Sequence, residues 1–153
     1  MEKAYKPMNE VLVGLFKDIY DIEEKALIKG EFKNITNNDM HIIEAVGIGQ
    51  KKNMSSIAKA MSVTMGTLTI SMNSLVKKGY VLRERSETDR RVVLISLTEK
   101  GERAFRHHEE FHREMIDAIV KKLGPEKEAV LQEALEELLE FFKSYSGKSK
   151  EKA

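Results

Sequence analysis

Two adjacent arginines lie at a predicted turn in the segment RSETDRRVVLISLTEKG, residues 85–101. The alternating, apolar stretches YVLRER and VVLISL flank the polar residues SETDR, which is the pattern of a β-hairpin. Arg90 and Arg91 are therefore expected at the hairpin tip, where their guanidinium groups suit DNA phosphates or a narrow minor groove, and Asp89 can hold a neighbouring guanidinium in place. A solvated tip has the same composition, so the assignment depends on the segments before it.

Two short helices are predicted immediately before the hairpin. Asn53 suits the N-cap of a helix MSSIAKAM, with Ile57, Ala58 and Met61 inward, and Thr64 suits the N-cap of MGTLTISMNSLVKK. Gly79 is a typical stop for the second helix. Two helices followed by a hairpin indicate a winged helix-turn-helix, with the second helix as the recognition helix. Its predicted buried face consists of Leu68, Met72, Leu75 and Val76.

The opposite face of the recognition helix carries hydroxyl, amide and apolar groups that can contact base edges and phosphates. This face has no arginine, so a two-bond contact to guanine cannot come from the helix, and we infer a preference for A·T-rich operators. The residues predicted to bind double-stranded DNA are Thr64, Met65, Gly66, Thr67, Thr69, Ile70, Asn73, Lys77, Asp89, Arg90 and Arg91.

The charge distribution agrees with a polyanion-binding module in the middle of the chain. Residues 35–100 hold ten Lys or Arg against six Asp or Glu, a balance of +4, whereas the whole chain carries only +1. With 153 residues and 41% apolar content, the chain suits one domain with dimerisation arms. It contains no cysteine, which excludes disulfides, thiolate zinc sites and thiol redox sensing.

Further helices are predicted on both sides of this module. The apolar spacing indicates helices from about Met8 to Ile28, over residues 37–47, from about Glu99 to Leu123 after a Thr98 cap, and from Pro125 to about Tyr145. The first and last helices carry apolar faces that need a partner. We therefore predict a mainly α fold with a small β-hairpin. Its parts are an N-terminal dimerisation helix in 1–34, a winged helix-turn-helix in 35–100, C-terminal dimerisation helices in 101–145 and a flexible polar tail in 146–153.

The segments SVTMGTLTISMNSLVKKGYV and RSETDRRVVLISLTEKG resemble the MarR family of bacterial transcriptional regulators. The family hallmark is a D-x-R wing that runs into an L-T-x-x-G segment, matched here by Asp89, Arg91, Leu97, Thr98 and Gly101. The resemblance covers nearly the whole chain. It implies a homodimer whose two winged helices bind a pseudo-palindromic operator.

Three segments, DMHIIEAVG, VTMGTLTISMNSL and HHEEFH, are most similar to the repressors of fatty-acid biosynthesis genes in low-GC Gram-positive bacteria. That resemblance implies an effector that is a long acyl chain carried on acyl carrier protein. An apolar channel between the first, second and fifth helices would hold the acyl chain, although the side chains that would line it can simply fill the core. The residues predicted to line it are Phe16, Ile19, Ile43, Phe105, Phe111 and Met115.

The histidines keep a zinc-responsive regulator, or a regulator of another small ligand, as the alternative. His108 and His112 are spaced i, i+4 on one helix face, and His41 with Glu23 or Glu24 can complete a ligand set. The resemblance supports this alternative because zinc-sensing members of the family pair metal-ligating residues of the second and fifth helices. Hydrogen-bonded histidines at a helix crossing are the plainer interpretation, so we predict no resident metal or cofactor.

Catalysis and membrane insertion have little support in the sequence. The chain has no glycine-rich phosphate loop, no G-x-S-x-G elbow and no cysteine nucleophile, and the acidic runs EEALEELLE and HEEFHREM fit solvated helix faces. No apolar stretch approaches the roughly 20 residues of a membrane span, and no segment has the pattern of a signal peptide. We predict a cytoplasmic regulator that is not an enzyme.

Overall fold

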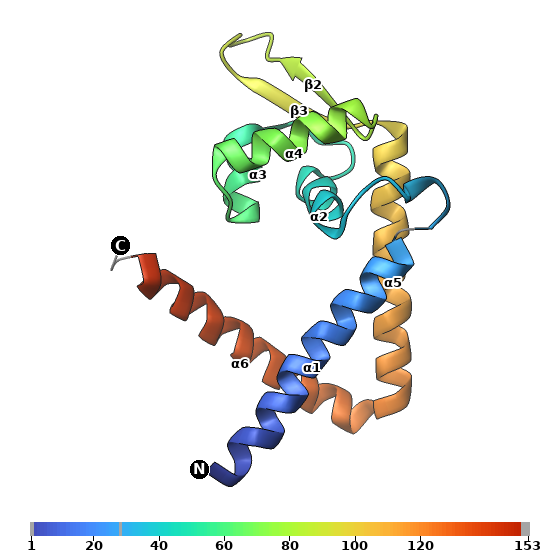
Figure 1. The fold of residues 1–153 in the computed structure, drawn as a ribbon, viewed down its shortest axis with the longest axis vertical. Helices are drawn as coiled ribbons and strands as arrows, with labels where there is room; N and C mark the ends of the chain where they lie inside the picture. The colour runs from blue at the N-terminus through green and yellow to red at the C-terminus, as the bar shows by residue number, and fades with distance from the viewer. Residues whose placement is uncertain (1, 28, 151–153) are drawn as a thin grey trace. The chain divides into compact units, whose positions relative to one another are not determined.

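The computed structural model describes residues 2–27 and 29–150, and the side chains of residues 6–27 and 29–145. Within these residues the chain forms six α-helices, one short 3₁₀ helix and three strands (Figure 1). The chain divides into two compact units after Phe111. None of the described helices combines the length and the apolar run needed to cross a membrane.

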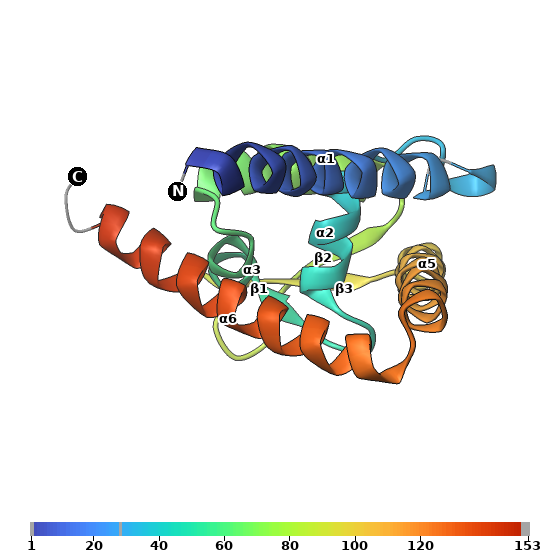
Figure 2. The ribbon, with the colours of Figure 1, turned by 90° about the horizontal axis from the view of Figure 1, so that it is seen from below.

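The first unit contains most of the elements. In chain order these are α1 (Glu2–Leu27), η1 (Gly30–Phe32), α2 (Asn37–Val46), β1 (Lys52–Asn53), α3 (Met54–Met61), α4 (Met65–Lys77), β2 (Val81–Arg85), β3 (Val93–Leu97) and the first half of α5 (Glu99–Leu123). The strands form one antiparallel sheet in the order β1-β3-β2. The loop between β2 and β3 lies at the end of the hairpin remote from α5 (Figures 1 and 2).

Side-chain caps fix where the helix pair α3 and α4 begins. Asn53 Oδ1 accepts a hydrogen bond from Ser56 N at 2.8 Å, and Thr64 Oγ1 accepts one from Thr67 N at 3.2 Å. Both predicted N-caps are confirmed. Between the helices Ser62 adopts a left-handed conformation with φ 54°, which turns the chain tightly into α4.

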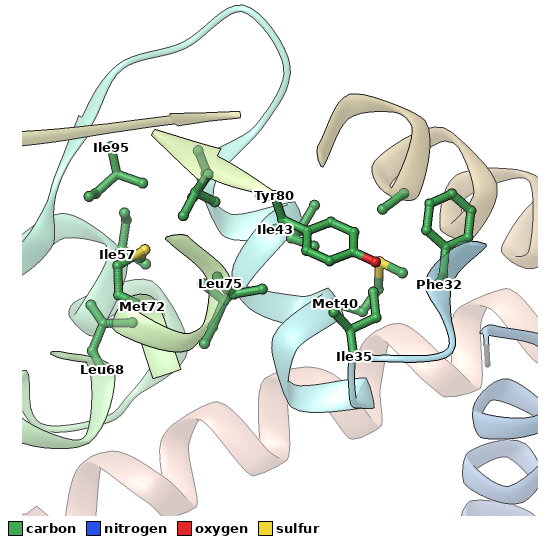
Figure 3. Packing of buried hydrophobic residues seen from close by; sticks show 14 of the residues in the cluster. Phe32, Ile35, Met40, Ile43, Ile57, Leu68, Met72, Leu75, Tyr80 and Ile95 are labelled. Atoms are coloured by element: carbon green, nitrogen blue, oxygen red, sulfur yellow. The ribbon is translucent and has the colours of Figure 1, made fainter. Parts of the chain in front are cut away.

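The core of the first unit is built by α2, α3, α4 and the sheet (Figure 3). The α4 side chains Leu68, Met72 and Leu75 are fully buried, as predicted, and they pack with Ile57 and Ile95. Val76 was predicted on the same face, but its side chain is 38% exposed. One residue advances a helix by about 100°, so Val76 lies past the edge of the buried stripe.

A tight junction ties α4, the hairpin and α5 together. Thr98 Oγ1 donates a hydrogen bond to Gly79 O at 2.6 Å and accepts one from Gly101 N at 3.1 Å, which confirms Thr98 as the cap of α5. Gly79 ends α4 with φ 79°. Gly101 is buried so closely that a Cβ atom there would lie 2.1 Å from Tyr80 O. The L-T-x-x-G segment is therefore the backbone joint that holds the hairpin against α5.

The second unit contains the rest of α5 and α6 (Pro125–Lys150), separated by Gly124 with φ 76°. α6 continues to Lys150, so residues 146–150 of the segment predicted as a flexible tail are helical, and residues 151–153 lie outside the described part. α1 starts at Glu2 and not at Met8. The prediction missed the first turns because they lack the apolar stripe on which it depended. The two-residue strand β1 was missed because it is too short to show a period of two.

Gly101→Ala is expected to lower the free energy of unfolding by about 3 kcal/mol, because the new methyl group overlaps a backbone carbonyl that cannot rotate away. Urea denaturation followed by circular dichroism measures the change. Gly14→Ala is the control, since a Cβ atom at this helical glycine meets nothing within 4 Å and should raise stability by up to about 1 kcal/mol. Equal midpoints for Gly101→Ala and the wild type would contradict the proposed role of this contact.

Candidate nucleic-acid interface

The outer face of α4 is presented to solvent because the opposite face is anchored in the core. Met65 is 46% exposed and Ile70 is 75% exposed, although both are large apolar residues. All predicted DNA-binding residues of this segment are exposed, namely Thr64, Met65, Gly66, Thr67, Thr69, Ile70, Asn73 and Lys77. The structure thus places them on the exposed surface of α4, from its N-cap Thr64 to its last residue Lys77.

Several hydroxyl groups on this surface already have partners inside the protein. Thr69 Oγ1 donates to Met65 O at 2.7 Å, and the hydroxyl oxygens of Thr64 and Thr67 lie 3.0 Å apart. These bonds are local side-chain contacts of the kind that helix starts and exposed threonines commonly make. A base or phosphate has to compete with them for the same hydroxyl groups.

The wing is the loop between β2 and β3, which pair in register from Val81 with Leu97 to Arg85 with Val93. Asp89 Oδ1 accepts from Arg91 N at 3.0 Å and from Arg91 Nε at 3.3 Å. Asp89 therefore orients the Arg91 guanidinium, while the side chain of Arg91 stays 93% exposed. Arg90 is exposed beside it. Both arginines remain accessible to a polyanion.

A groove of about 290 Å³ connects the wing with the starts of both helices. It brings Met65 at the start of α4 together with Arg91, so the structure unites the two predicted groups of DNA-contacting residues on one surface. Sequence reasoning did not place Asn53 and Ser55 here, although the predicted cap at Asn53 marks a helix start, where backbone N–H groups favour anions. The lining residues are Asn53, Met54, Ser55, Met65, Arg91, Val92 and Val93.

A buried polar cluster lies elsewhere in the first unit and joins α1, α2 and α5. His108 is fully buried, with Nε2 at 2.6 Å from Glu23 Oε1 and Nδ1 at 2.7 Å from Glu44 Oε1. His41 Nδ1 lies 3.3 Å from the other oxygen of Glu44. Glu24, the other predicted carboxylate, is exposed. One ligand atom from each of Glu23, His41 and His108 falls within 4.8 Å of the others.

The carboxylates determine the charge state of this cluster. Burial alone lowers the pKa of His108, but hydrogen bonding and negative charge from Glu44 and Glu23 outweigh it and raise the pKa. Burial likewise acts to raise the pKa of Glu44, and the opposing contacts with His108 and His41 hold it below its usual range. A protonated imidazole donates from both nitrogens, so the arrangement fits a charged His108 between two carboxylates.

The residues predicted to line an acyl channel have very different environments. Ile43 is fully buried in the core and Phe105 packs against that core, whereas Phe16 on α1 is 62% exposed. The others, Ile19, Phe111 and Met115, are half-buried, and Met115 belongs to the second unit, as does the histidine His112.

Comparison with known proteins places this architecture among transcription regulators. FabT of Streptococcus pneumoniae, solved in complex with DNA, is 38% identical over 92% of this chain and 98% of FabT, with a TM-score of 0.87. The regulator FarR of Neisseria gonorrhoeae is 31% identical over 105 residues, which cover 69% of this chain and 72% of FarR. MepR of Staphylococcus aureus, at 19% identity over 88% of this chain and 97% of MepR, shares the fold with a TM-score of 0.70.

An exposed recognition helix beside an arginine-tipped wing, on this fold and with these relatives, defines a winged helix-turn-helix DNA-binding transcriptional regulator. Residues 25–108 match the family described as transcriptional regulator SarA/Rot, which is more than half of the chain. The chain belongs to this family of MarR-type regulators. The predicted family and fold class are confirmed, and the relatives are regulators, not enzymes.

The His108 cluster should make stability depend on pH. A raised pKa in the folded state gives stability that is complete below the unfolded value of 6.5 and is lost as the pH rises through the folded pKa. The free energy of unfolding should therefore fall more steeply above about pH 6.5 for the wild type than for His108→Gln. Urea titrations at several pH values, in the presence of EDTA, measure the two slopes.

Glu44→Gln provides the matched variant for this measurement, because it keeps the imidazole and removes one of the two carboxylates. Its slope should fall between those of the wild type and His108→Gln. Parallel curves for the wild type and His108→Gln would show that His108 does not carry the charge assigned to it.

Proposed function

We propose that the protein is a repressor that binds a pseudo-palindromic, A·T-rich operator as a homodimer and controls fatty-acid biosynthesis genes. The observation that carries the proposal is the similarity to FabT. FabT is 38% identical to this protein over 92% of the chain, and its structure was solved in complex with DNA. The similarity of the second helix, the recognition helix and the HHEEFH segment to fatty-acid repressors supports the same role. A regulator of chromosomal genes works in the cytoplasm.

The apolar faces of α1 and α6 support the homodimer. Each helix exposes a row of large apolar side chains, and an exposed apolar surface of this extent is typical of an interface. In the second unit, α5 and α6 also enclose an apolar groove of about 370 Å³ lined by Ile116, Ile119 and Leu135, among others. The exposed residues are Met8, Val11, Val13, Leu15, Phe16, Tyr20 and Ile22 on α1, and Val130, Leu131, Leu135, Leu138, Leu139, Phe141, Phe142 and Tyr145 on α6.

Leu135→Asp is expected to weaken the dimer at least tenfold, because burying an unpaired carboxylate in an apolar interface costs several kcal/mol. Sedimentation equilibrium measures the dimer dissociation constant. Glu133→Ala, at an exposed position of the same helix, should leave that constant unchanged. A wild-type protein that sediments as a monomer would refute the homodimer.

The proposed effector is a long acyl chain delivered by acyl carrier protein. The half-buried positions Ile19, Phe111 and Met115 are the members of the predicted channel that can change partners without opening the core. Aromatic rings and flexible methionine suit a ligand of varying length. A ligand changes operator affinity only by binding more tightly to the conformation that fits the operator.

A zinc-responsive regulator is the second candidate, and the clustering of Glu23, His41 and His108 favours it. Imidazole nitrogen and carboxylate oxygen are ordinary zinc ligands. Both ring nitrogens of His108 already face carboxylates at 2.6 and 2.7 Å, so these contacts have to change when a metal binds. The residues fit zinc in type, and binding requires deprotonation of an imidazole whose pKa the two glutamates raise.

Acyl carrier protein loaded with a long acyl chain is expected to raise operator affinity, and Phe111→Gln should abolish the increase while basal affinity stays nearly unchanged. Fluorescence anisotropy with labelled operator DNA measures both quantities. His108→Ala is the reciprocal variant, because of the two effector responses it should remove only the response to zinc. An affinity that rises with zinc, depends on His108 and ignores acyl chains would replace the lipid effector with the metal.

A further inference from the structure

Ile70 is the most exposed of the large apolar side chains in the described residues, at 75%. It lies in the middle of α4, on the side opposite the fully buried Leu68, Met72 and Leu75. An isolated exposed isoleucine on a helix contributes nothing to folding, and isoleucine is not among the best helix formers. The proposed homodimer would cover the exposed apolar side chains of α1 and α6, but it leaves the side chain of Ile70 exposed.

The neighbours of Ile70 make this part of the helix more apolar than its sequence suggests. The hydroxyl of Thr69 is bound to Met65 O at 2.7 Å, so the methyl group of Thr69 is the part left to meet a ligand. The side chain of Met65, one turn before Thr69, is 46% exposed. Methionine, a threonine methyl group and isoleucine are therefore the apolar groups that the first half of α4 exposes, and Ile70 is the one directly opposite the buried face.

The basic residues lie at the end of α4 and on the wing. The one basic residue of α4 is Lys77 in its last turn, and the wing contributes Arg90 and Arg91. These charges suit the phosphates on either side of a groove. The exposed Ile70 side chain fits an apolar group on the base edges, and the C5 methyl group of thymine is such a group in the major groove.

We propose that Ile70 determines sequence specificity by contacting thymine C5 methyl groups in the major groove. The proposal deepens the operator recognition described above and rests on it. It also gives the A·T preference a positive cause, since the contact rewards thymine in addition to the absence of an arginine that would reward guanine.

Uracil in place of thymine tests the contact, because the two bases pair identically and differ only in the methyl group. The probe is the duplex that the wild-type protein enriches from a random-sequence library, compared with the same duplex containing deoxyuridine at one thymine or at all of them. Fluorescence anisotropy without any effector measures the dissociation constants. The wild type should lose about fourfold in affinity for each contacted methyl group.

Ile70→Ala should bind the thymine duplex with a similar loss and should no longer distinguish uracil at the contacted positions. Its exposed position means that the fold is retained. Leu82→Ala is the matched control, since Leu82 is 50% exposed on β2 at the base of the hairpin, and it should keep the full uracil effect. Arg91→Ala should weaken binding to both duplexes by the same factor.

Equal affinity of the wild type for the thymine and uracil duplexes would overturn the proposal. A uracil effect that persists unchanged in Ile70→Ala, or that disappears only in Met65→Ala, would overturn the assignment to Ile70. Failure to enrich any duplex would refute operator recognition itself, and this outcome differs from those that refute only the contact of Ile70 with thymine methyl groups.

Discussion

The close approach of α5 to the backbone at Tyr80 is the constraint on which the DNA-facing surface depends. Gly101 leaves room for Tyr80 O, and Thr98 binds Gly79 O, so the end of α4 and the start of the hairpin are held against one helix. Lys100 adds a bond from Nζ to Lys78 O at 3.1 Å and lies 4.3 Å above the Tyr80 ring. The recognition helix and the wing therefore share one support, and a change there moves both.

A second set of contacts holds α2 along its length. Near its start, Asp39 Oδ2 accepts from Thr36 N and from Lys78 Nζ, both at 3.1 Å, which links α2 to the end of α4. Farther along, Glu44 meets His108 of α5. The helix is thus a rigid element between the recognition helix and the buried histidine. Any ligand that displaces Glu44 acts on a helix whose other end is already bound to α4.

Sequence reasoning was accurate where one residue controls a local structure. Asn53, Thr64 and Thr98 were identified as caps because a side-chain oxygen at a helix start has few other roles. Helical periodicity likewise predicted which residues of α4 are exposed on its outer face. The winged architecture could therefore be predicted from residues 53–101 alone.

The failures at the histidine cluster and the predicted channel have a different cause, since they concern contacts between segments distant in the chain. The predicted histidine set included Glu24 and Glu23 as equals, and only the packing of α1 shows that Glu23 is the buried one. Likewise, no periodic pattern could show that Ile43 fills the core while Phe16 stays exposed. Periodicity assigns a side chain to a helix face, but the partner of that face depends on tertiary structure.

The DNA-facing surface separates two tasks that the sequence mixes. Exposed arginine at the wing attracts any duplex, because phosphates are present at every position and their contribution is independent of sequence. The outer face of α4 is almost uncharged, and two of its threonines already bond within the protein. Such a face would gain little from phosphates, so any free energy of binding to DNA would have to come from shape and apolar contact with base edges. A helix of this composition is suited to distinguish sequences, while the exposed arginines of the wing are suited to the phosphates that every duplex presents.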